Sequence, residues 1–338
     1  MRRKRKSLVV PYAVKNILLD ILLIGLGLVV FAYFHHVRPS SMEAVELVLD
    51  VGDLPMDADE PFADEDAEEP SADASTPSAD AEEPLQDANP FTDGEHILED
   101  LYYATDSVRI EISTGRSASS WYTVADIRVK NPSLIKTAFA KDREATGHSE
   151  GVPSMAQRNN AILACNGDYF GTRKKGLVIR NGKLYRKQMS DDTCVLFADG
   201  TMEIYSSKGF DLDGITAKKP LQAWSFGPSL LAEDGSAIEG FKHAVAPKNP
   251  RTAIGYYAPG HYCLVAVDGR QTSREDKTSS GMTLTELSAL MAQLGCKKAY
   301  NLDGGRSSVM VFNGKTVNAP YKGGRGSSDI IYIGKGGD

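Results

Sequence analysis

Apolar and polar residues alternate along several segments of this chain from about residue 97 onward. Residues 108–112 and 122–129 alternate in this way, which predicts two half-buried strands. Residues 161–165 form a short continuous apolar run, which is typical of a central strand. Pairs of a polar residue and a glycine between extended segments predict three hairpin turns, at Asn181-Gly182, Asp199-Gly200 and Asn313-Gly314.

Helical periodicity is clearest over residues 283–294. Thr283 fits an N-cap, and Glu286, three residues later, completes a capping box. Gly295 then ends the helix. Because strands outnumber helices by far, the pattern predicts an α+β fold. We expect one strand-rich, mixed-sheet domain with a few helices over residues 97–338.

The N-terminal segment has the features of a membrane anchor. Residues 1–15 are basic and are expected to form a cytoplasmic tail. Residues 16–36 are expected to form a transmembrane signal anchor, because the apolar run 17–34 would span about 27 Å as a helix. Asp20 interrupts this run near its basic end. The positive-inside rule then places the rest of the chain outside the cell as a single-pass membrane protein. A cleavable signal peptide is the alternative.

A strongly acidic segment follows the predicted anchor. Residues 39–108 contain 22 Asp and Glu and no Lys or Arg. Such a segment is poor in apolar surface and its like charges repel. We therefore expect a disordered acidic linker over residues 37–96, which holds the domain away from the membrane.

The remaining chain is basic. Residues 109–338 contain 31 Lys and Arg against 22 Asp and Glu, a net charge of +9. This excess is explained either by a solvated surface or by a groove that attracts an anionic substrate. No dense basic run with interleaved aromatic residues occurs, so nucleic acid is not expected as a partner.

Familiar motifs of other enzyme classes are missing from the sequence. It contains no Gly-x-Ser-x-Gly, no His-Glu-x-x-His and no P-loop, which argues against serine hydrolases, zincins and P-loop enzymes. No Cys-x-x-Cys pair occurs either, which argues against a zinc or redox site. The four cysteines leave the disulfide state open: Cys165, Cys194, Cys263 and Cys296.

Carboxylates follow three of the predicted strands, at Asp168, Asp268 and Asp303. Because one helix separates the last two strands, we expect these strands to be parallel and their aspartates to share a sheet edge. Carboxylates gathered at one point would serve acid–base catalysis or bind a metal, and turn capping is the alternative. The loop at residues 279–283, before the capped helix, is expected to seat an anion.

Five segments over residues 160–335 form a set that occurs in one order. They are Asn166-Gly167-x-Tyr169-Phe170, Asn249-Pro250-Arg251-Thr252, Val267-Asp268-Gly269-Arg270, Ser280-Gly281-Met282-Thr283-Leu284-x-Glu286-Leu287 and Asn301-Leu302-Asp303-Gly304-Gly305-x-Ser307-Ser308. As a set they resemble the phosphodiester glycosidase family, which includes the lysosomal uncovering enzyme and bacterial exopolysaccharide-related proteins.

The resemblance implies a hydrolase that cleaves a sugar from a sugar-1-phosphodiester in a cell-surface glycan or wall polymer. Asp303 and Asp268 are the candidates for the carboxylate that activates water or attacks the anomeric carbon. Arg251 is expected to bind the phosphate, and Asn166 to hold phosphate or sugar hydroxyls. No cofactor is required, although a divalent cation such as calcium is left open. The further candidates for substrate binding are Gly167, Asp168, Arg270, Ser280, Gly281, Gly304, Gly305, Arg306, Ser307, Ser308 and Arg325.

Two positions depart from the family's pattern. Arg306 stands where the family has a third glycine, and Asp168 stands where a small or neutral residue is expected. Arg306 could contact the phosphate or block part of the pocket. Two other functions are compatible with the same residues: a non-catalytic binding module for anionic wall polymer, and a metal-dependent phosphodiesterase that acts at phosphorus.

Overall fold

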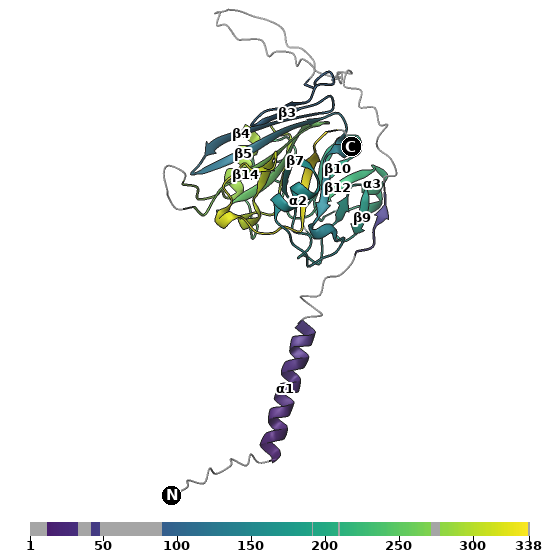
Figure 1. Ribbon diagram of the computed structural model, residues 1–338, viewed down its shortest axis with the longest axis vertical. Coiled ribbons are helices and arrows are strands. Elements are labelled where there is room, and N and C mark those ends of the chain that lie inside the picture. Colours follow the sequence, from purple (N-terminus) through teal and green to yellow (C-terminus); the bar gives the residue numbers. More distant parts are fainter. Residues whose placement is uncertain are drawn as a thin grey trace, which may run out of the picture.

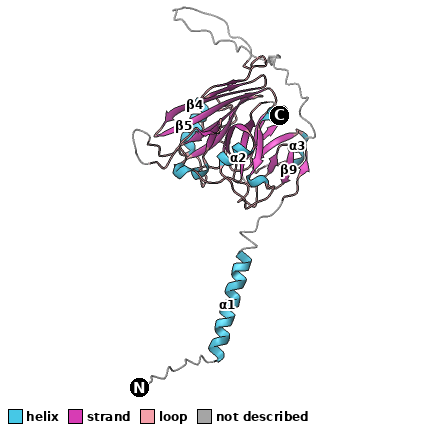
Figure 2. Ribbon diagram, in the orientation of Figure 1, coloured by secondary structure: helices cyan, strands magenta, loops and turns pink. Residues whose placement is uncertain are grey.

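The computed structural model describes residues 12–32, 42–47, 90–190, 192–208, 210–271 and 278–336. Strands dominate the described part, and short helices lie around them (Figure 1; Figure 2). The expectation of one strand-rich body with few helices is therefore confirmed.

Three sheets build this body, and each pair of neighbouring strands is antiparallel. The seven-stranded sheet has the order β15 (Lys298–Asn301), β13 (Arg251–Ala258), β14 (His261–Val267), β5 (Ser120–Val129), β4 (Val108–Ser117), β3 (Tyr102–Ala104) and β2 (Ile97–Leu98). The six-stranded sheet has the order β1 (Val45–Glu46), β9 (Lys183–Arg186), β8 (Val178–Arg180), β12 (Pro220–Trp224), β10 (Thr193–Phe197) and β11 (Met202–Tyr205). The five-stranded sheet has the order β17 (Lys315–Thr316), β16 (Met310–Phe312), β7 (Ala161–Asn166), β18 (Asp329–Gly334) and β6 (Lys136–Phe139).

One apolar core joins the three sheets. Ile110 of β4, Leu163 of β7 and Leu196 of β10 all belong to it, and all three side chains are fully buried. Helices cover the outer faces: α4 (Leu284–Gln293) packs on β13 and β14, α2 (Val152–Arg158) on the five-stranded sheet, and α3 (Leu212–Ala217) on the six-stranded sheet.

The local sequence signals for turns and for α4 are confirmed. The hairpins β8–β9, β10–β11 and β16–β17 turn at the three predicted residue pairs. Thr283 caps α4, and its hydroxyl accepts a hydrogen bond from the Glu286 amide at 3.1 Å. The Glu286 carboxylate accepts one from the Thr283 amide in return, which completes the predicted capping box.

Strand β13 determines which residues meet at the functional edge. Strands β14 and β15 run in the same direction, as predicted, but they do not pair with each other. β13 lies between them and is antiparallel to both. The ends of β14 and β15 therefore lie at the same sheet edge as Arg251, the first residue of β13.

The prediction of a transmembrane helix over residues 16–36 is wrong. Helix α1 (Tyr12–Ala32) forms there, but no helix in the described part of the chain is long and apolar enough to cross a bilayer. Its side chains are described from Leu19 to Val30. The location outside the cell stays a prediction.

The predicted linker is described only in part. Residues 1–11 of the predicted basic tail, and residues 37–41 and 48–89 of the acidic linker, lie outside the described residues. Residues 42–47 differ from the expectation of disorder, because Val45 and Glu46 form β1 on the edge of the six-stranded sheet. Leu47 packs against the apolar residues beneath α3.

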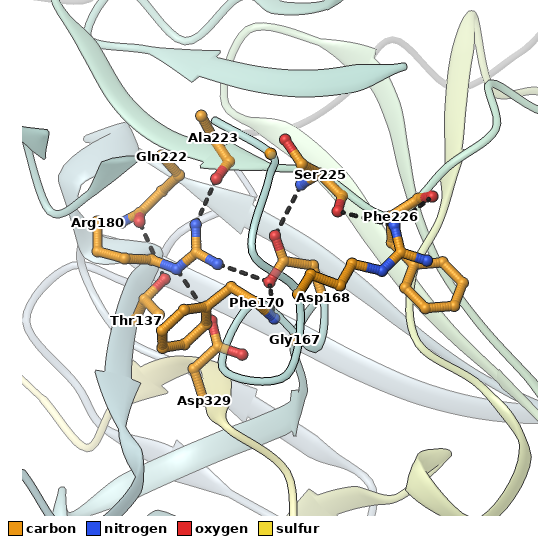
Figure 3. Close-up of polar contacts among 12 residues, drawn as sticks. Thr137, Gly167, Asp168, Phe170, Arg180, Gln222, Ala223, Ser225, Phe226 and Asp329 are labelled. Carbon is orange, nitrogen blue, oxygen red and sulfur yellow. Dashed lines mark hydrogen bonds and ion pairs between the residues drawn. The ribbon is translucent and has the colours of Figure 1, made fainter. Parts of the chain in front are cut away.

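A buried arginine joins two of the sheets (Figure 3). Nη2 of Arg180, in β8, lies 2.8 Å from Oδ1 of Asp168, and its Nε lies 2.9 Å from Oδ2 of Asp329, in β18. Its side chain is 0% exposed, as is that of Asp329. Asp168 also accepts hydrogen bonds from the amides of Phe170 and Ser225. We call Arg180, Asp168 and Asp329 the buried triad.

Replacing the central arginine of the buried triad should strongly destabilise the fold. In Arg180→Met two buried carboxylates lose their cation, which typically costs about 3–5 kcal/mol of unfolding free energy. Urea unfolding measures the change. The matched control is Lys183→Met in the next strand, whose exposed ion pair with Glu46, at 3.5 Å, should contribute less than about 1 kcal/mol. Equal losses in the two variants would contradict a structural role for the triad.

Candidate active site

A cleft of about 290 Å³ opens where β13 begins and where the chain leaves β15. We call it the arginine cleft. It is lined by Phe226, Val245, Asn249, Pro250, Arg251, Arg270, Asp303, Gly304, Gly305, Arg306 and Arg325.

The arginine cleft is strongly positive. Four of its lining residues are arginines and one, Asp303, is acidic, which leaves an excess of three positive charges. Clustered cations with low-dielectric walls attract anions, and the planar guanidinium group suits phosphate oxygens. The residues around Asp303 therefore favour an anionic ligand.

Arg251 is held by backbone carbonyl groups. Its Nε donates to the Met282 carbonyl at 2.8 Å, and its Nη2 donates to the carbonyls of Val245 and Pro247 at 2.7 and 2.6 Å. None of its described partners is a carboxylate. Burial, together with the nearby charge of Arg270, lowers the pKa of Arg251 to about 10, so the side chain is still charged at neutral pH.

Asp303 lies against Arg325 in the same cleft. Oδ2 of Asp303 accepts a hydrogen bond from Nη2 of Arg325 at 3.0 Å, and its side chain is 7% exposed. Arg325 also donates to the Ser307 hydroxyl at 2.7 Å and lies over the Tyr169 ring. Burial raises the pKa of Asp303, while Ser307 and Arg325 lower it. A carboxylate of this kind suits proton transfer or nucleophilic attack.

Asn166 fixes the backbone beneath Asp303. It is fully buried, and its Nδ2 donates to the Asp303 carbonyl at 2.7 Å. Its Oδ1 accepts hydrogen bonds from the Thr252 hydroxyl at 2.9 Å and from the Val309 amide at 3.3 Å. The Asp303 amide in turn donates to the Gly167 carbonyl at 3.4 Å. Asn166 is thus placed to position Asp303 from below the cleft.

Two glycines let the segment after Asp303 approach β13 closely. A Cβ atom at Gly304 would lie 2.6 Å from the Pro250 carbonyl oxygen, which is closer than side chains approach. Gly305 has a φ of +66°, a conformation that favours glycine. The Gly305 amide donates to the same Pro250 carbonyl at 2.9 Å.

Arg270 and Arg306 complete the positive wall. Arg270 donates to the Asn249 side-chain oxygen, and Arg306 donates to the Gly324 carbonyl at 3.0 Å. Neither has a carboxylate partner among the described residues. Arg306 thus lines the cleft, where it adds to the positive charge.

Asp268 lies in a different cleft. This second cleft, of about 370 Å³, is lined by Thr114, Trp121, Tyr122, Thr123, Asp268, Gln271, Val317, Asn318 and Ala319. We call it the Trp121 cleft. Burial raises the pKa of Asp268 to about 6, although hydrogen bonds from Ala319 and Asn318 oppose the shift. Asp268 and Asp303 thus share a sheet edge but line different clefts.

The three predicted aspartates do not gather at one point. Asp168 is fully buried in the triad, whereas Asp268 and Asp303 each line their own cleft. Among the described residues, no three His, Cys, Asp or Glu side chains are grouped so that they could hold a metal ion.

Several other predicted residues line neither cleft. Gly167 packs against Asp329 of the triad, where a Cβ atom would lie 2.2 Å from Oδ1. The Ser280 hydroxyl contacts that of Ser119 at 2.6 Å, and Ser308 accepts a hydrogen bond from Thr252 at 3.2 Å. Gly281 and Ser307 are also absent from the linings. Thr283 and Glu286 cap the N-terminus of α4, and the amides of Ser280 and Met282 donate to the carbonyls of Ser119 and Asn249, so these amides are not free to bind an anion as expected.

Sequence reasoning missed four lining residues of the arginine cleft. Phe226 and Val245 are apolar and carry no chemical signal, and they come from segments that no motif marked. Asn249 and Pro250 precede Arg251 in a motif that the sequence did reveal. Because they are adjacent to Arg251 in this motif, their place in the lining could have been predicted from the sequence.

Comparisons with known proteins agree with this fold. A zebrafish N-acetylglucosamine-1-phosphodiester α-N-acetylglucosaminidase catalytic domain, auto-inhibited by its pro-peptide, has a similar structure, with a TM-score of 0.52 and 22% identity over 68% of this chain and 83% of that chain. At this identity the likeness shows the fold alone. The SPbeta prophage-derived uncharacterized protein YomE of Bacillus subtilis (strain 168) is 30% identical over 205 residues, which cover 55% of this chain. They cover only 31% of YomE, so the match spans about a third of that relative.

A family model described as phosphodiester glycosidase matches residues 159–334, just over half of the 338 residues. The matched residues include those of the arginine cleft, from Phe226 to Arg325. The chain belongs to the phosphodiester glycosidase family.

Proposed function

We propose that this protein hydrolyses the bond between the anomeric carbon of a sugar and the phosphate of a phosphodiester. The products would be a free sugar and a phosphomonoester. The single observation that carries the proposal is the arginine cleft, in which four arginines surround one carboxylate, Asp303.

Three of these arginines are available for the phosphate. Arg251, Arg270 and Arg306 bond only to carbonyl or amide oxygens among the described residues. A phosphodiester carries one negative charge, and the departing phosphomonoester gains a second as the glycosidic bond breaks. Fixed cations at this position stabilise the departing group more than the bound substrate, which is the condition for catalysis.

One carboxylate is enough for this chemistry. The second ionisation of a phosphomonoester has a pKa of about 6, so the leaving group needs little protonation near neutral pH. The acid that ordinary glycosidases supply with a second carboxylate is then not required. Asp303 would act on the other side of the bond, either by activating water or by attacking the anomeric carbon.

The substrate class follows from the charge of the cleft and of the basic part of the chain. A sugar-1-phosphodiester within an anionic glycan, such as a wall polymer, presents the linkage that the cleft would bind. The net charge of +9 over residues 109–338 would also favour the approach of such a polymer.

Loss of the Asp303 charge should abolish turnover without loss of folding. In Asp303→Asn, sugar release from a sugar-1-phosphodiester should fall by about 10²- to 10⁴-fold. Burial raises the pKa of Asp303, so ionisation of this group lowers stability as pH rises above the usual aspartate range. The asparagine variant should therefore melt at the same or a higher temperature at pH 7. Asp234→Asn, at a fully exposed position, is the matched control. Full activity in Asp303→Asn would remove this residue from the mechanism.

The Arg325 contact should set the pH dependence of Asp303. Arg325 lowers the pKa of Asp303, so Arg325→Met should raise it. If Asp303 acts in its ionised form, the acid limb of the kcat profile will move to higher pH. Arg306→Met, which removes a cation without a contact to Asp303, should instead lower kcat and leave the limb in place. An unmoved limb in Arg325→Met would contradict the assigned role of Asp303.

The position of bond cleavage separates the proposal from its alternatives. Hydrolysis in ¹⁸O-labelled water should give an unlabelled phosphomonoester, because water attacks the sugar carbon and the phosphate keeps its bridging oxygen. Mass spectrometry of the phosphomonoester measures this. Label in the phosphate would identify a phosphodiesterase that acts at phosphorus. Binding of the diester without any product would identify a binding module.

A further inference from the structure

The Trp121 cleft differs in chemistry from the arginine cleft. Its volume of about 370 Å³ lies within the range of about 300–1,000 Å³ that small-molecule sites occupy. It combines two aromatic residues, Trp121 and Tyr122, with the polar side chains of Asp268, Gln271 and Asn318. No Lys or Arg is among its described lining residues, so its chemistry does not favour phosphate.

The aromatic wall is held in place by the backbone. The Trp121 carbonyl accepts a hydrogen bond from the Asp268 amide at 3.0 Å, and the Trp121 amide donates to the Ser279 hydroxyl at the same distance. The Arg116 guanidinium lies 5.7 Å from the centre of the indole ring. The indole Nε1 is buried and has no hydrogen-bond partner among the described residues. The backbones of Trp121 and Asp268 are therefore held side by side before any ligand binds.

The Asp268 carboxylate uses only one of its oxygens. Oδ1 accepts hydrogen bonds from Asn318 at 3.1 Å and from the Ala319 amide at 2.9 Å. Oδ2 has no partner in the described part of the chain, although Asp268 is only 8% exposed. A carboxylate oxygen that lines a cleft and has no partner in the protein is open to a hydrogen-bond donor from a bound molecule. This oxygen therefore points to a ligand that carries hydroxyl groups.

A flat indole beside a carboxylate and the Gln271 amide suits the two faces of a sugar. The C–H face of a pyranose packs on an aromatic ring, and its hydroxyls donate to carboxylate and amide oxygens. We propose that the Trp121 cleft binds a neutral pyranose residue of a glycan, which stacks on Trp121 and donates a hydroxyl hydrogen bond to Asp268.

One short segment of the chain contributes to both clefts. Asp268 lines one and Arg270, two residues later, lines the other. The Arg270 guanidinium lies 5.7 Å from the ring centre of Tyr321, two residues after the Ala319 that lines the Trp121 cleft. If the proposed function holds, one glycan could place a sugar on Trp121 and its phosphodiester against the arginines.

Some residues that line the Trp121 cleft lie outside the part of the chain that the family model matches. Trp121 and Tyr122 belong to β5, which precedes the matched residues 159–334. The cleft would therefore give this protein a preference for a longer glycan that the family match by itself does not specify.

A glycan array with neutral oligosaccharides tests the proposal, followed by titration of the best-bound oligosaccharide by tryptophan fluorescence. The chain has two tryptophans, and Trp224 is fully buried, so a change in fluorescence on binding reports mainly on Trp121. We expect the wild type to bind and Trp121→Ala to weaken binding about tenfold or more. Because the alanine variant lacks this reporter, calorimetry measures its affinity. Asp268→Asn should weaken binding as well.

Three controls make the result decisive. Tyr102→Ala removes another half-buried aromatic beside an arginine, in β3 and outside the cleft, and should bind like the wild type. Trp121→Phe keeps an aromatic face and should restore part of the affinity, which excludes misfolding as the cause. Asp303→Asn should lose turnover but keep oligosaccharide binding, so that failure of the proposed reaction and failure of this site are distinguishable. Absence of neutral glycan binding, or unchanged binding by Trp121→Ala, would overturn the proposal.

Discussion

The structure depends most on a single buried cation, Arg180. It connects β8 of one sheet with β18 of another and with Asp168, which directly follows β7. Burial raises the pKa of Asp329, and the charge of Arg180 opposes this shift. Removal of the cation would leave buried carboxylates uncompensated, which is why the arrangement resists rearrangement.

The buried triad has a direct consequence for the arginine cleft. Its hydrogen bonds hold residues 166–168, and Asn166 and Gly167 in that segment bond to the backbone of Asp303. The carboxylate in the cleft is therefore supported by a framework that solvent does not reach. Such support keeps a catalytic group within the small displacement that efficient chemistry tolerates.

Local signals in the sequence are sufficient to predict the secondary-structure elements, but they do not predict which cleft or core each side chain enters. Asn-Gly and Asp-Gly pairs specify tight turns, and Thr283 with Glu286 specifies a helix start, because the interactions involved span only a few residues. The shared edge of β14 and β15 was also predictable. The separation of Asp268 from Asp303 was not, because it depends on β13, which lies between the two strands. The role of Asp168 depends on Arg180 and Asp329, whose pairing no local pattern marks.

The apolar run near the N-terminus is long enough in the sequence to predict a membrane-spanning helix. The described helix does not meet the combined requirement of length and apolar character for crossing a bilayer.

The environment of Arg251 explains how a buried arginine can remain available to a substrate. A carboxylate partner would neutralise its charge, whereas the carbonyls of Val245, Pro247 and Met282 contribute only dipoles. These dipoles fix the guanidinium plane, and no carboxylate among the described residues forms an ion pair with the group. Burial lowers the pKa of Arg251 only to about 10, far above neutral pH. The free energy needed to bury this charge is spent when the protein folds. The guanidinium group therefore needs no reorganisation when negative charge develops on a departing phosphate.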